Sequence, residues 1–384
     1  KTPVLVEALK DRLDDEGILY RTPYIEAAPA YVAKPNGIEE ANLPAWLKTF
    51  FSALAKAHLG VYPAPFSHQI QALEAAVRGR DLFVATGTGS GKTECFLWPL
   101  LAKLAGEAHE NPAMWRMRGI RAIILYPMNA LVSDQVSRLR RLIGDPAHGF
   151  LRAFHHVASG ARRPQFGMYT GRTPYPGNEP DSRQDAALAR TLAHLLPQEA
   201  HQDFHNQLLA DGKIPAKEDL EAFLMRVRKG DHTPSPEDAE LITRFEIQKT
   251  TPDILITNYS MLEYMLMRPI EAHLWDETRA WLAASEENRL LFVIDEAHMY
   301  RGSSGGEVAL LLRRMLYRLG IGRDRVQFIL TTASMPASTE EDDCAVKAFA
   351  MHLTAAKDFS SFEYLTGERE DITKCGKREI PSEA

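Results

Sequence analysis

Short runs of apolar residues recur along the chain, and most of them end at a cluster of polar or small residues. Continuous apolar runs of this length are typical of strands buried on both faces of a parallel sheet. Segments with helical spacing separate them, so we predict an α/β fold whose parallel sheet has helices on both faces. The predicted strands lie at residues 81–84, 122–127, 167–169, 251–260, 290–294 and 327–330, and the last of these is the final clear strand.

The same pattern divides the chain into regions. Residues 1–60 precede the alternation and contain two predicted helices, at 4–13 and 43–59, which we expect to form an N-terminal helical accessory arm. Residues 61–345 carry the predicted sheet. Prolines open and close the stretch 173–248, and the spacing between them is helical, so we expect a helical insertion there.

The segment Ala85–Thr93, Ala-Thr-Gly-Thr-Gly-Ser-Gly-Lys-Thr, follows the first predicted strand and leads into a helical pattern. A strand, a glycine-rich loop and a helix are the context of a phosphate-binding loop. Its glycines let backbone N–H groups approach an anion, and the helix presents the positive end of its dipole. Lys92 can reach the outer phosphates, and the Thr93 hydroxyl can ligate Mg²⁺. Thr86 departs from the general pattern, which has glycine there.

Two adjacent acids, Asp295 and Glu296, end the apolar run 290–294. ATP hydrolysis needs a carboxylate that holds Mg²⁺ and a neighbour that orients the attacking water. We assign the first role to Asp295 and the second to Glu296, because two charges beside a core edge are otherwise costly. Without the glycine-rich loop, a surface pair of acids would be the simpler interpretation.

Other polar residues lie near these two segments. The amide of Gln69 matches the donor and acceptor of an adenine edge, although a polar residue that begins a helix would look the same. His298, Thr332 and Ser334 are candidates for passing the nucleotide state to the substrate side, and a satisfied turn is the alternative. The full predicted sets are Phe66, Gln69, Thr88, Gly89, Ser90, Gly91, Lys92, Thr93 and Glu94 for the nucleotide, Lys92, Asp295, Glu296 and His298 for catalysis, and Thr93 and Asp295 for Mg²⁺.

Composition changes this picture little. The 384 residues carry a formal net charge of −6, which does not indicate a nucleic-acid binder, although a large ATPase can still carry a local basic groove. The three cysteines are far apart and show no zinc spacing, which suits a reducing cytoplasm. Pro99 and Lys103 interrupt the longest apolar run, so we predict no membrane-spanning segment and a cytoplasmic protein.

Taken in order, seven motifs resemble those of superfamily 2 helicases of the DEAD/DEAH type. They are Gln69, the Gly-Ser-Gly-Lys-Thr loop, Tyr-Pro-Met-Asn-Ala-Leu, Tyr-Thr-Gly-Arg, Ile-Thr-Asn-Tyr, Asp-Glu-Ala-His and Thr-Ala-Ser. The coupling motif reads Thr-Ala-Ser rather than Ser-Ala-Thr, which keeps both hydroxyls. The resemblance implies a RecA-like P-loop NTPase domain that uses ATP and Mg²⁺ to move along nucleic acid.

The residues after the acidic box, from Met299 to Arg314, look like a narrower branch of 3′–5′ DNA helicases that often carry a C-terminal zinc module. Within it, the segments 42–47 and 125–132 are similar to large helicases of bacterial anti-phage systems, such as the Druantia type. The resemblance implies single-stranded or forked DNA as the substrate, a role in phage defence or DNA repair, and a defence-system or nuclease partner. It places Pro127, Asn129, Gln135, Thr170, Gly171, Arg172, Thr257, Asn258 and Arg301 along the nucleic-acid groove.

Three alternatives stay open: a translocase that feeds DNA to a nuclease without separating strands, an RNA helicase, and an inactive nucleic-acid-binding scaffold. The family also needs a second RecA-like domain, whose arginine completes the ATP site. Residues 346–384 are too few for such a domain. We therefore expect them to begin a linker or a following domain, and the chain to be one half of a motor.

Overall fold

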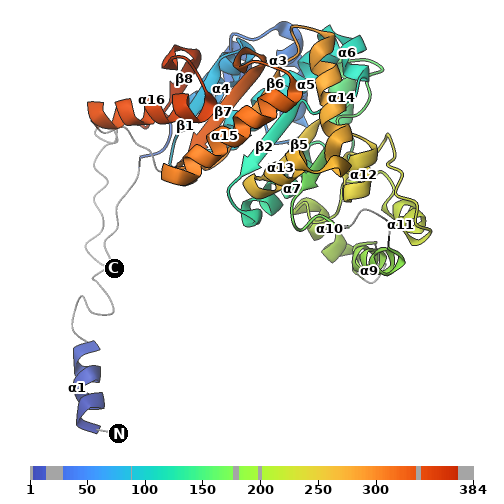
Figure 1. Ribbon diagram of the computed structural model, residues 1–384, viewed down its shortest axis with the longest axis horizontal. Helices are drawn as coiled ribbons and strands as arrows, with labels where there is room; N and C mark the ends of the chain where they lie inside the picture. Colours follow the sequence, from blue (N-terminus) through green and yellow to red (C-terminus); the bar gives the residue numbers. More distant parts are fainter. Residues whose placement is uncertain are drawn as a thin grey trace. The chain divides into compact units, whose positions relative to one another are not determined.

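The computed structural model describes residues 3–13, 29–87, 89–175, 181–197, 201–333 and 339–370. The chain forms two units, residues 1–31 with 369–384 and residues 32–368. The described part of the first unit contains α1 (Pro3–Leu13) and an antiparallel bridge between Tyr31 and Arg369. The sheet belongs to the second unit (Figure 1).

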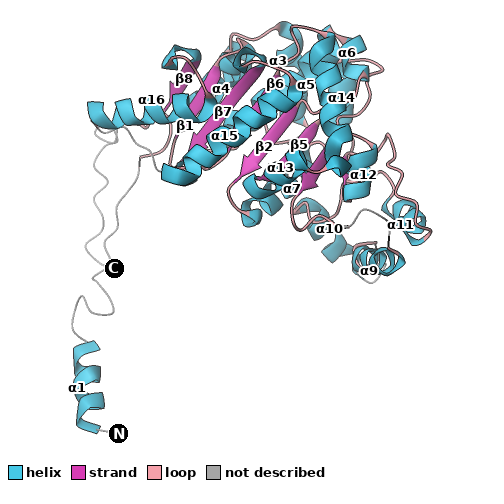
Figure 2. Cartoon of the chain, viewed as in Figure 1, coloured by secondary structure: helices cyan, strands magenta, loops and turns pink. Residues whose placement is uncertain are grey.

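The second unit is built on an eight-stranded sheet in which every paired strand is parallel to its neighbour (Figure 2). The strand order is β4-β3-β5-β2-β6-β7-β1-β8. The strands are β1 (Asp81–Ala85), β2 (Ala122–Tyr126), β3 (Phe166–Tyr169), β4 (Glu240–Leu241), β5 (Ile254–Asn258), β6 (Leu290–Ile294), β7 (Val326–Thr332) and β8 (Phe362–Leu365). The predicted α/β fold with a parallel sheet is confirmed.

Successive strand residues enter two different cores, because side chains alternate across a sheet. Ile124 packs in the core on one face and Ile123 in the core on the other. The first face is covered by α3 (Ala45–Lys56), α4 (Ser67–Val77), α5 (Glu94–Glu110), α6 (Pro112–Arg116), α7 (Asn129–Leu142) and α8 (Gly149–Val157). The second is covered by α13 (Tyr259–Met267), α14 (Ala272–Ala284), α15 (Gly302–Leu319) and α16 (Glu340–Thr354).

The remaining elements are short or lie in the region of the expected insertion. They are α2 (Gly37–Glu40), α9 (Ser182–Ala193), α10 (Gln202–Ala210), α11 (Leu220–Arg228), α12 (Arg244–Lys249), η2 (Pro269–Glu271), η3 (Ala297–Met299), η4 (Arg323–Arg325) and η5 (Phe359–Ser361). Helices α9 and α11 share a small apolar core of their own, which includes Ala189 and Phe223. No helix among the described residues is both long and apolar enough to cross a membrane.

The structure corrects one prediction about the sheet. The strand at 327–330 is not the final one, because β8 pairs in parallel with β1 and extends the sheet. Strand β4 was also not predicted; it lies within 173–248 and pairs with β3. Helix α3, from the expected accessory arm, packs within the second unit against α5 and α8. The boundaries of the arm, the insertion and the linker stay predictions.

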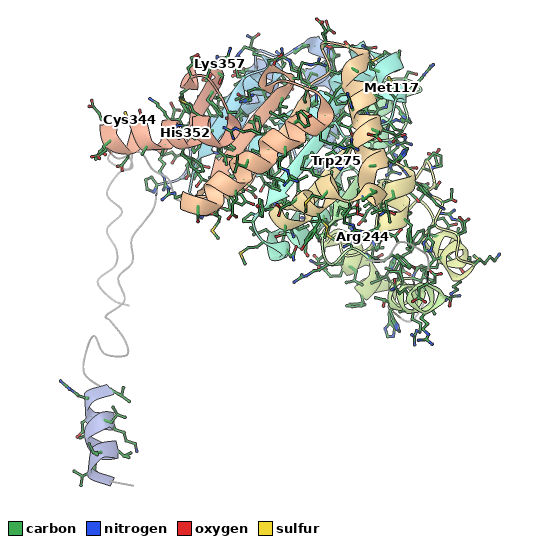
Figure 3. The ribbon with its side chains drawn as sticks, in the orientation of Figure 1. Met117, Arg244, Trp275, Cys344, His352 and Lys357 are labelled. Carbon is green, nitrogen blue, oxygen red and sulfur yellow. The ribbon has the colours of Figure 1, made fainter. Side chains whose placement is uncertain are left out.

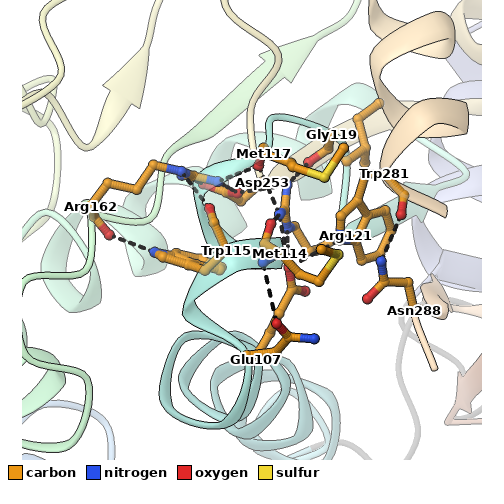
Figure 4. A network of polar contacts seen from close by, with 12 residues as sticks. Glu107, Met114, Trp115, Met117, Gly119, Arg121, Arg162, Asp253, Trp281 and Asn288 are labelled. Carbon is orange, nitrogen blue, oxygen red and sulfur yellow. Dashed lines mark hydrogen bonds and ion pairs between the residues drawn. The ribbon is translucent and has the colours of Figure 1, made fainter. Parts of the chain in front are cut away.

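A buried polar network holds the amino ends of the strands (Figure 4). Arg121, just before β2, is enclosed by the rings of Trp115 and Trp281, with its guanidinium carbon 5.3 and 4.8 Å from their centroids. Its Nη2 donates to Glu107 at 2.8 Å. Asp253, just before β5, accepts two hydrogen bonds from Arg162, at 2.7 and 2.6 Å. The network joins the starts of two central strands to α5, α6 and α14.

Candidate nucleotide site and nucleic-acid interface

The glycine-rich loop joins β1 to α5. Gly89 and Gly91 have φ values of +74° and +72°, a left-handed conformation that glycine adopts without a Cβ clash. The Lys92 ammonium lies inside the loop, where Nζ donates to the carbonyls of Thr86 at 3.1 Å and Gly87 at 2.9 Å. The loop thus concentrates a cation and turned backbone at the start of a helix, which suits an anion. The predicted residue Thr88 lies outside the described residues.

The departure at Thr86 has a structural reason that sequence reasoning missed. The hydroxyls of Thr86 and Ser90 lie 2.7 Å apart in a hydrogen bond, and both side chains are buried. This bond links two loop residues that flank Gly87 and Gly89 in the sequence. A glycine at position 86, as in the general pattern, would leave the Ser90 hydroxyl without this partner.

The start of α4 braces the same loop. The Gln69 Nε2 donates to the Gly91 carbonyl at 3.2 Å, and its Oε1 accepts from the backbone N–H of Phe66 at 2.9 Å. Nε2 of His68 lies 2.8 Å from the Ser90 carbonyl. Burial lowers the pKa of His68, although this hydrogen bond opposes the shift. Gln69 therefore lies in the first turn of its helix and also contacts the loop. Its contact with adenine stays a prediction.

The two acids follow β6 as expected. Asp295 is buried and accepts hydrogen bonds from the Thr331 hydroxyl on β7 and from the backbone N–H of Glu296. Burial raises the pKa of Asp295, and the neighbouring charge of Glu296 adds to the shift. Glu296 itself has φ +50°, an uncommon conformation for a residue other than glycine, of the kind that clusters at functional sites.

Glu296 is linked to the end of β7 through His298. The Glu296 Oε2 lies 3.2 Å from the His298 Nδ1, and the Thr332 hydroxyl lies 3.2 Å from the same nitrogen. The structure thus brings together Glu296, His298 and Thr332, three of the residues predicted for catalysis and coupling. Ser334, also predicted for coupling, lies outside the described residues.

A pocket of about 650 Å³ joins these segments into one site. Gln135, expected in the nucleic-acid groove, also lines this pocket, and its contact with nucleic acid stays a prediction. Arg138 also lines it and donates to Glu94 at 3.2 Å. Leu131, Gln135 and Arg138 recur at helical spacing along α7, the signal that could have found them. The lining consists of Tyr62, Ala64, Phe66, Gln69, Gly89, Gly91, Lys92, Thr93, Glu94, Leu131, Gln135, Arg138, Asp295 and Glu296.

This lining suits a magnesium-bound triphosphate. The Lys92 ammonium and the turned backbone match phosphate oxygens. The Thr93 hydroxyl and the Asp295 carboxylate are the hard oxygen ligands that Mg²⁺ prefers. The raised pKa of Asp295 supports the same assignment. A bound cation would stabilise the ionised form of this buried carboxylate, which has a like charge beside it.

The residues expected along the nucleic-acid groove lie mainly at the carboxyl ends of three adjacent strands, β3, β5 and β2. The Asn258 Nδ2 donates to the Asn129 Oδ1 at 2.6 Å, and the Thr257 hydroxyl donates to the Tyr169 carbonyl at 2.7 Å. Pro127 directly follows β2, and Thr170, Gly171 and Arg172 directly follow β3, whereas the exposed Arg301 precedes α15.

Arg244 of α12, labelled in Figure 3, contacts the turn after β3. Its Nη2 donates to the Thr170 carbonyl at 3.0 Å, and its guanidinium carbon lies 5.2 Å from the centre of the Tyr169 ring. The Thr170 hydroxyl accepts from the backbone N–H of Arg172 at 3.2 Å. The turn therefore has a fixed backbone while the Arg172 side chain stays exposed.

Comparison with known proteins gives the family. The family model of the DEAD/DEAH box helicases matches residues 66–167 and 212–342. The Druantia protein DruE of Escherichia coli (strain UMEA 4076-1) is 41% identical over 403 residues, which cover 95% of this chain and 21% of that protein. DEAD-box ATP-dependent RNA helicase 41 of Arabidopsis thaliana is 34% identical over 102 residues, 23% of this chain and 20% of that protein.

Among solved structures, the DUF1998 helicase MrfA bound to DNA and AMPPNP is similar over 94% of this chain and 33% of its own, with 18% identity and a TM-score of 0.47. The chain thus spans about a fifth to a third of the length of these relatives. The family model covers well over half of the chain, in the region that holds the loop and the acids. The chain belongs to the DEAD/DEAH box helicase family.

Proposed function

We propose that this chain is the first RecA-like domain of an ATP-dependent 3′–5′ DNA helicase. The observation that carries the proposal is the pocket in which Lys92, Thr93, Asp295 and Glu296 line one cavity, although they come from two segments far apart in the sequence. A phosphate-binding loop that faces paired carboxylates suits the hydrolysis of a nucleoside triphosphate.

The side chains divide the work by position. Lys92 and the loop backbone bind the phosphates, while Thr93 and Asp295 hold Mg²⁺. Bound Mg²⁺ supplies positive charge that stabilises the phosphate oxygens. Glu296 orients the attacking water and accepts its proton, and His298 with Thr332 passes the change at Glu296 to the end of β7. We assign Gln135 to the nucleotide pocket that it lines.

The proposed DNA strand contacts the carboxyl ends of β2, β3 and β5, where Asn129, Asn258, Thr170 and Arg172 offer donors to its backbone. Contacts of this kind are tolerant of sequence, as a motor requires. The similarity to a Druantia protein supports phage defence as the role. DNA as the substrate rests on the resemblance of residues 299–314 to the branch of 3′–5′ DNA helicases. A cytoplasmic location and a defence-system or nuclease partner belong to the same proposal.

The proposed motor needs a second RecA-like domain of the same full-length protein, whose arginine completes the ATP site. ATP binding closes the cleft between the two domains, and hydrolysis reopens it. We keep the proposed boundaries of the arm at 1–60, the ATPase domain at 61–345 with its insertion at 173–248, and the following segment at 346–384.

The deciding experiment measures ATP hydrolysis by the full-length protein with single-stranded DNA, with RNA of the same sequence, and with neither. We expect stimulation by DNA and not by RNA. Equal stimulation by RNA would favour an RNA helicase. A strand-displacement assay on a 3′-tailed duplex follows, and hydrolysis without displacement would favour a translocase that serves a nuclease.

A further inference from the structure

A groove runs between α3 and α8, on the face of the sheet that α5 covers. Edge-to-face contacts of Phe50 with Phe150 and Phe154, at 6.2 and 6.5 Å between ring centres, hold the two helices together. The outer surfaces of the helices then form a groove of about 830 Å³. Ser52, Ala53 and Gly149 are among the small residues that line it.

The groove is basic. Lys48, Lys56 and Arg152 line it, and Glu39 is the one acidic residue among the described residues of its lining. Both helices are described in full, and neither carries an aspartate or a glutamate. This concentration of positive charge stands out in a chain with a formal net charge of −6.

Two of these three cations donate hydrogen bonds to backbone carbonyls, which do not neutralise their charge. Within the described residues, none of the three forms an ion pair with a carboxylate. Lys48 donates to the backbone carbonyl of Glu39 at 2.8 Å, and Arg152 donates to that of Ala147 at 2.8 Å. A backbone carbonyl fixes a cationic side chain but does not neutralise its charge, so these side chains remain able to bind an anion.

We propose that this groove binds the phosphodiester backbone of nucleic acid, as a contact separate from the strand path at the carboxyl ends of β2, β3 and β5. Three cations on two neighbouring helices can contact phosphates of one nucleic-acid backbone, which carries a charge at every nucleotide. The contact adds affinity without reading sequence. The proposal rests on the proposed function for its ligand, and it assigns a role to the expected arm segment that contains α3.

The test measures DNA binding by the full-length protein as a function of salt. The groove variant carries Lys48→Ala, Lys56→Ala and Arg152→Ala together. Each lost phosphate contact lowers the slope of log K against log salt by about 0.9 for duplex DNA and about 0.7 for a single strand. We therefore expect the slope to fall by about 2–3 and the binding at low salt to weaken more than tenfold.

A matched control removes the same charge elsewhere. Arg183→Ala, Arg190→Ala and Lys229→Ala are exposed changes on or beside α9 and α11. We expect the control slope to stay within about 1 of the wild type, because charges away from a contact act only through the screened field. Circular dichroism melts of both variants verify the fold, which exposed changes of this kind leave in place.

The result that overturns the proposal is a groove variant with the wild-type slope, or one that loses no more than the control. Competition by polyglutamate as strong as by DNA at equal charge would also overturn it, in favour of an acidic protein partner. Separate duplex and single-strand probes show which form the groove binds. The assay needs no hydrolysis, and the three residues lie outside the nucleotide pocket. A failure of the proposed ATPase function would therefore be seen separately, as lost nucleotide binding in the wild type.

Discussion

At the scale of single residues, the candidate site combines a cation and two acids that lie in different parts of the sequence. Lys92 is held inside its loop by two carbonyls, and Asp295 is held by the Thr331 hydroxyl. Glu296 takes a left-handed backbone to place its carboxylate against His298. Because their surroundings differ, we expect substitutions of the two neighbouring acids to have different effects.

Glu296→Gln keeps the size of the side chain but removes its ability to accept a proton. We expect ATP hydrolysis by the full-length protein to fall about 10²–10⁴-fold, the range for loss of a general base. Nucleotide affinity should stay within a few-fold. Glu286→Gln, an exposed change just before β6, serves as the control. Full hydrolysis by the Glu296 variant would contradict the assigned role.

Asp295→Asn tests the meaning of the raised pKa. The folded state raises the Asp295 pKa above its ordinary value of 3.8, so the stabilisation from its protonated form is present below pH 3.8 and is lost as pH rises through the folded pKa. At pH 7 the ionised carboxylate therefore destabilises the fold. We expect Asp295→Asn to raise Tm at pH 7 in EDTA, by an amount that shrinks as pH falls, while hydrolysis is lost.

The control for this stability measurement is Asp134→Asn, an exposed change on α7. This change should leave Tm unchanged both at pH 7 and as the pH is lowered. A lower Tm for Asp295→Asn at pH 7 would show instead that the ionised carboxylate is a net stabilising group.

The sequence predicted the roles of those residues that lie in contiguous motifs. Lys92, Thr93, Asp295 and Glu296 were assigned from local patterns, and the structure places all four on one pocket. The bond between Thr86 and Ser90 and the position of Gln135 were missed, because both depend on how the loop and α7 turn in space.

At the scale of elements, the loop between β1 and α5 depends on its neighbour α4. A Cβ at Gly91 would lie 2.2 Å from the Gln69 Nε2, whereas a Cβ at Gly89 would meet nothing within 4 Å. The two glycines have nearly the same φ. Comparing them separates backbone strain from the loss of the Gln69 contacts.

We expect Gly89→Ala to lower the free energy of unfolding by about 1–2 kcal/mol, the cost of a left-handed residue with a Cβ. Gly91→Ala should cost about 2 kcal/mol more, because it displaces the Gln69 side chain and breaks its two hydrogen bonds. Urea unfolding gives both values. In a Gln69→Ala background the difference between the two glycine variants should largely vanish, and a difference that persists would exclude Gln69 as its cause.

We expect a larger loss of stability when the buried network at the amino ends of the strands is broken than when either glycine is replaced. Burial alone would raise the pKa of Asp253, but the guanidinium groups of Arg162 and Arg121 outweigh it and hold that pKa below its usual value. Arg121→Met leaves Asp253 and Glu107 short of a buried partner, which we expect to cost about 3–5 kcal/mol. Urea unfolding measures it.

Arg318→Met is the matched control, because Arg318 pairs with Asp276 at the surface, where an ion pair contributes about 0–1 kcal/mol. Equal losses for the two variants would contradict the view that burial of the network sets its value.

Sequence periodicity predicted the central strands well and failed at the edges of the sheet. β1, β2 and β6 are apolar throughout, apart from Asp81, and are buried. β4 has two residues, and β8 has four, of which only the first and the last are buried. Neither strand is long enough to show a periodic pattern that distinguishes it from a loop. Their strand state comes from pairing with β3 and β1, partners distant in the sequence.

At the scale of the whole molecule, the chain covers 21% of the Druantia protein DruE. A motor of this family closes its ATP site with a second domain. We therefore expect residues 1–384 alone to bind nucleotide weakly and to hydrolyse it slowly, without stimulation by DNA. Steady-state hydrolysis by the isolated chain measures this, and rapid, DNA-stimulated turnover would contradict the need for a second domain.

The proposed function depends on the binding of a magnesium nucleotide by the loop that contains Lys92 and by the acids Asp295 and Glu296. Isothermal titration of the chain with ATP, with and without Mg²⁺, tests it most directly, using Lys92→Ala, Asp295→Ala and the control Lys229→Ala. We predict that binding requires Mg²⁺ and that both site variants lose at least about tenfold in affinity, the effect of about 1.4 kcal/mol, while the control does not. Equal affinity with and without Mg²⁺, or binding unchanged in both site variants, would contradict it.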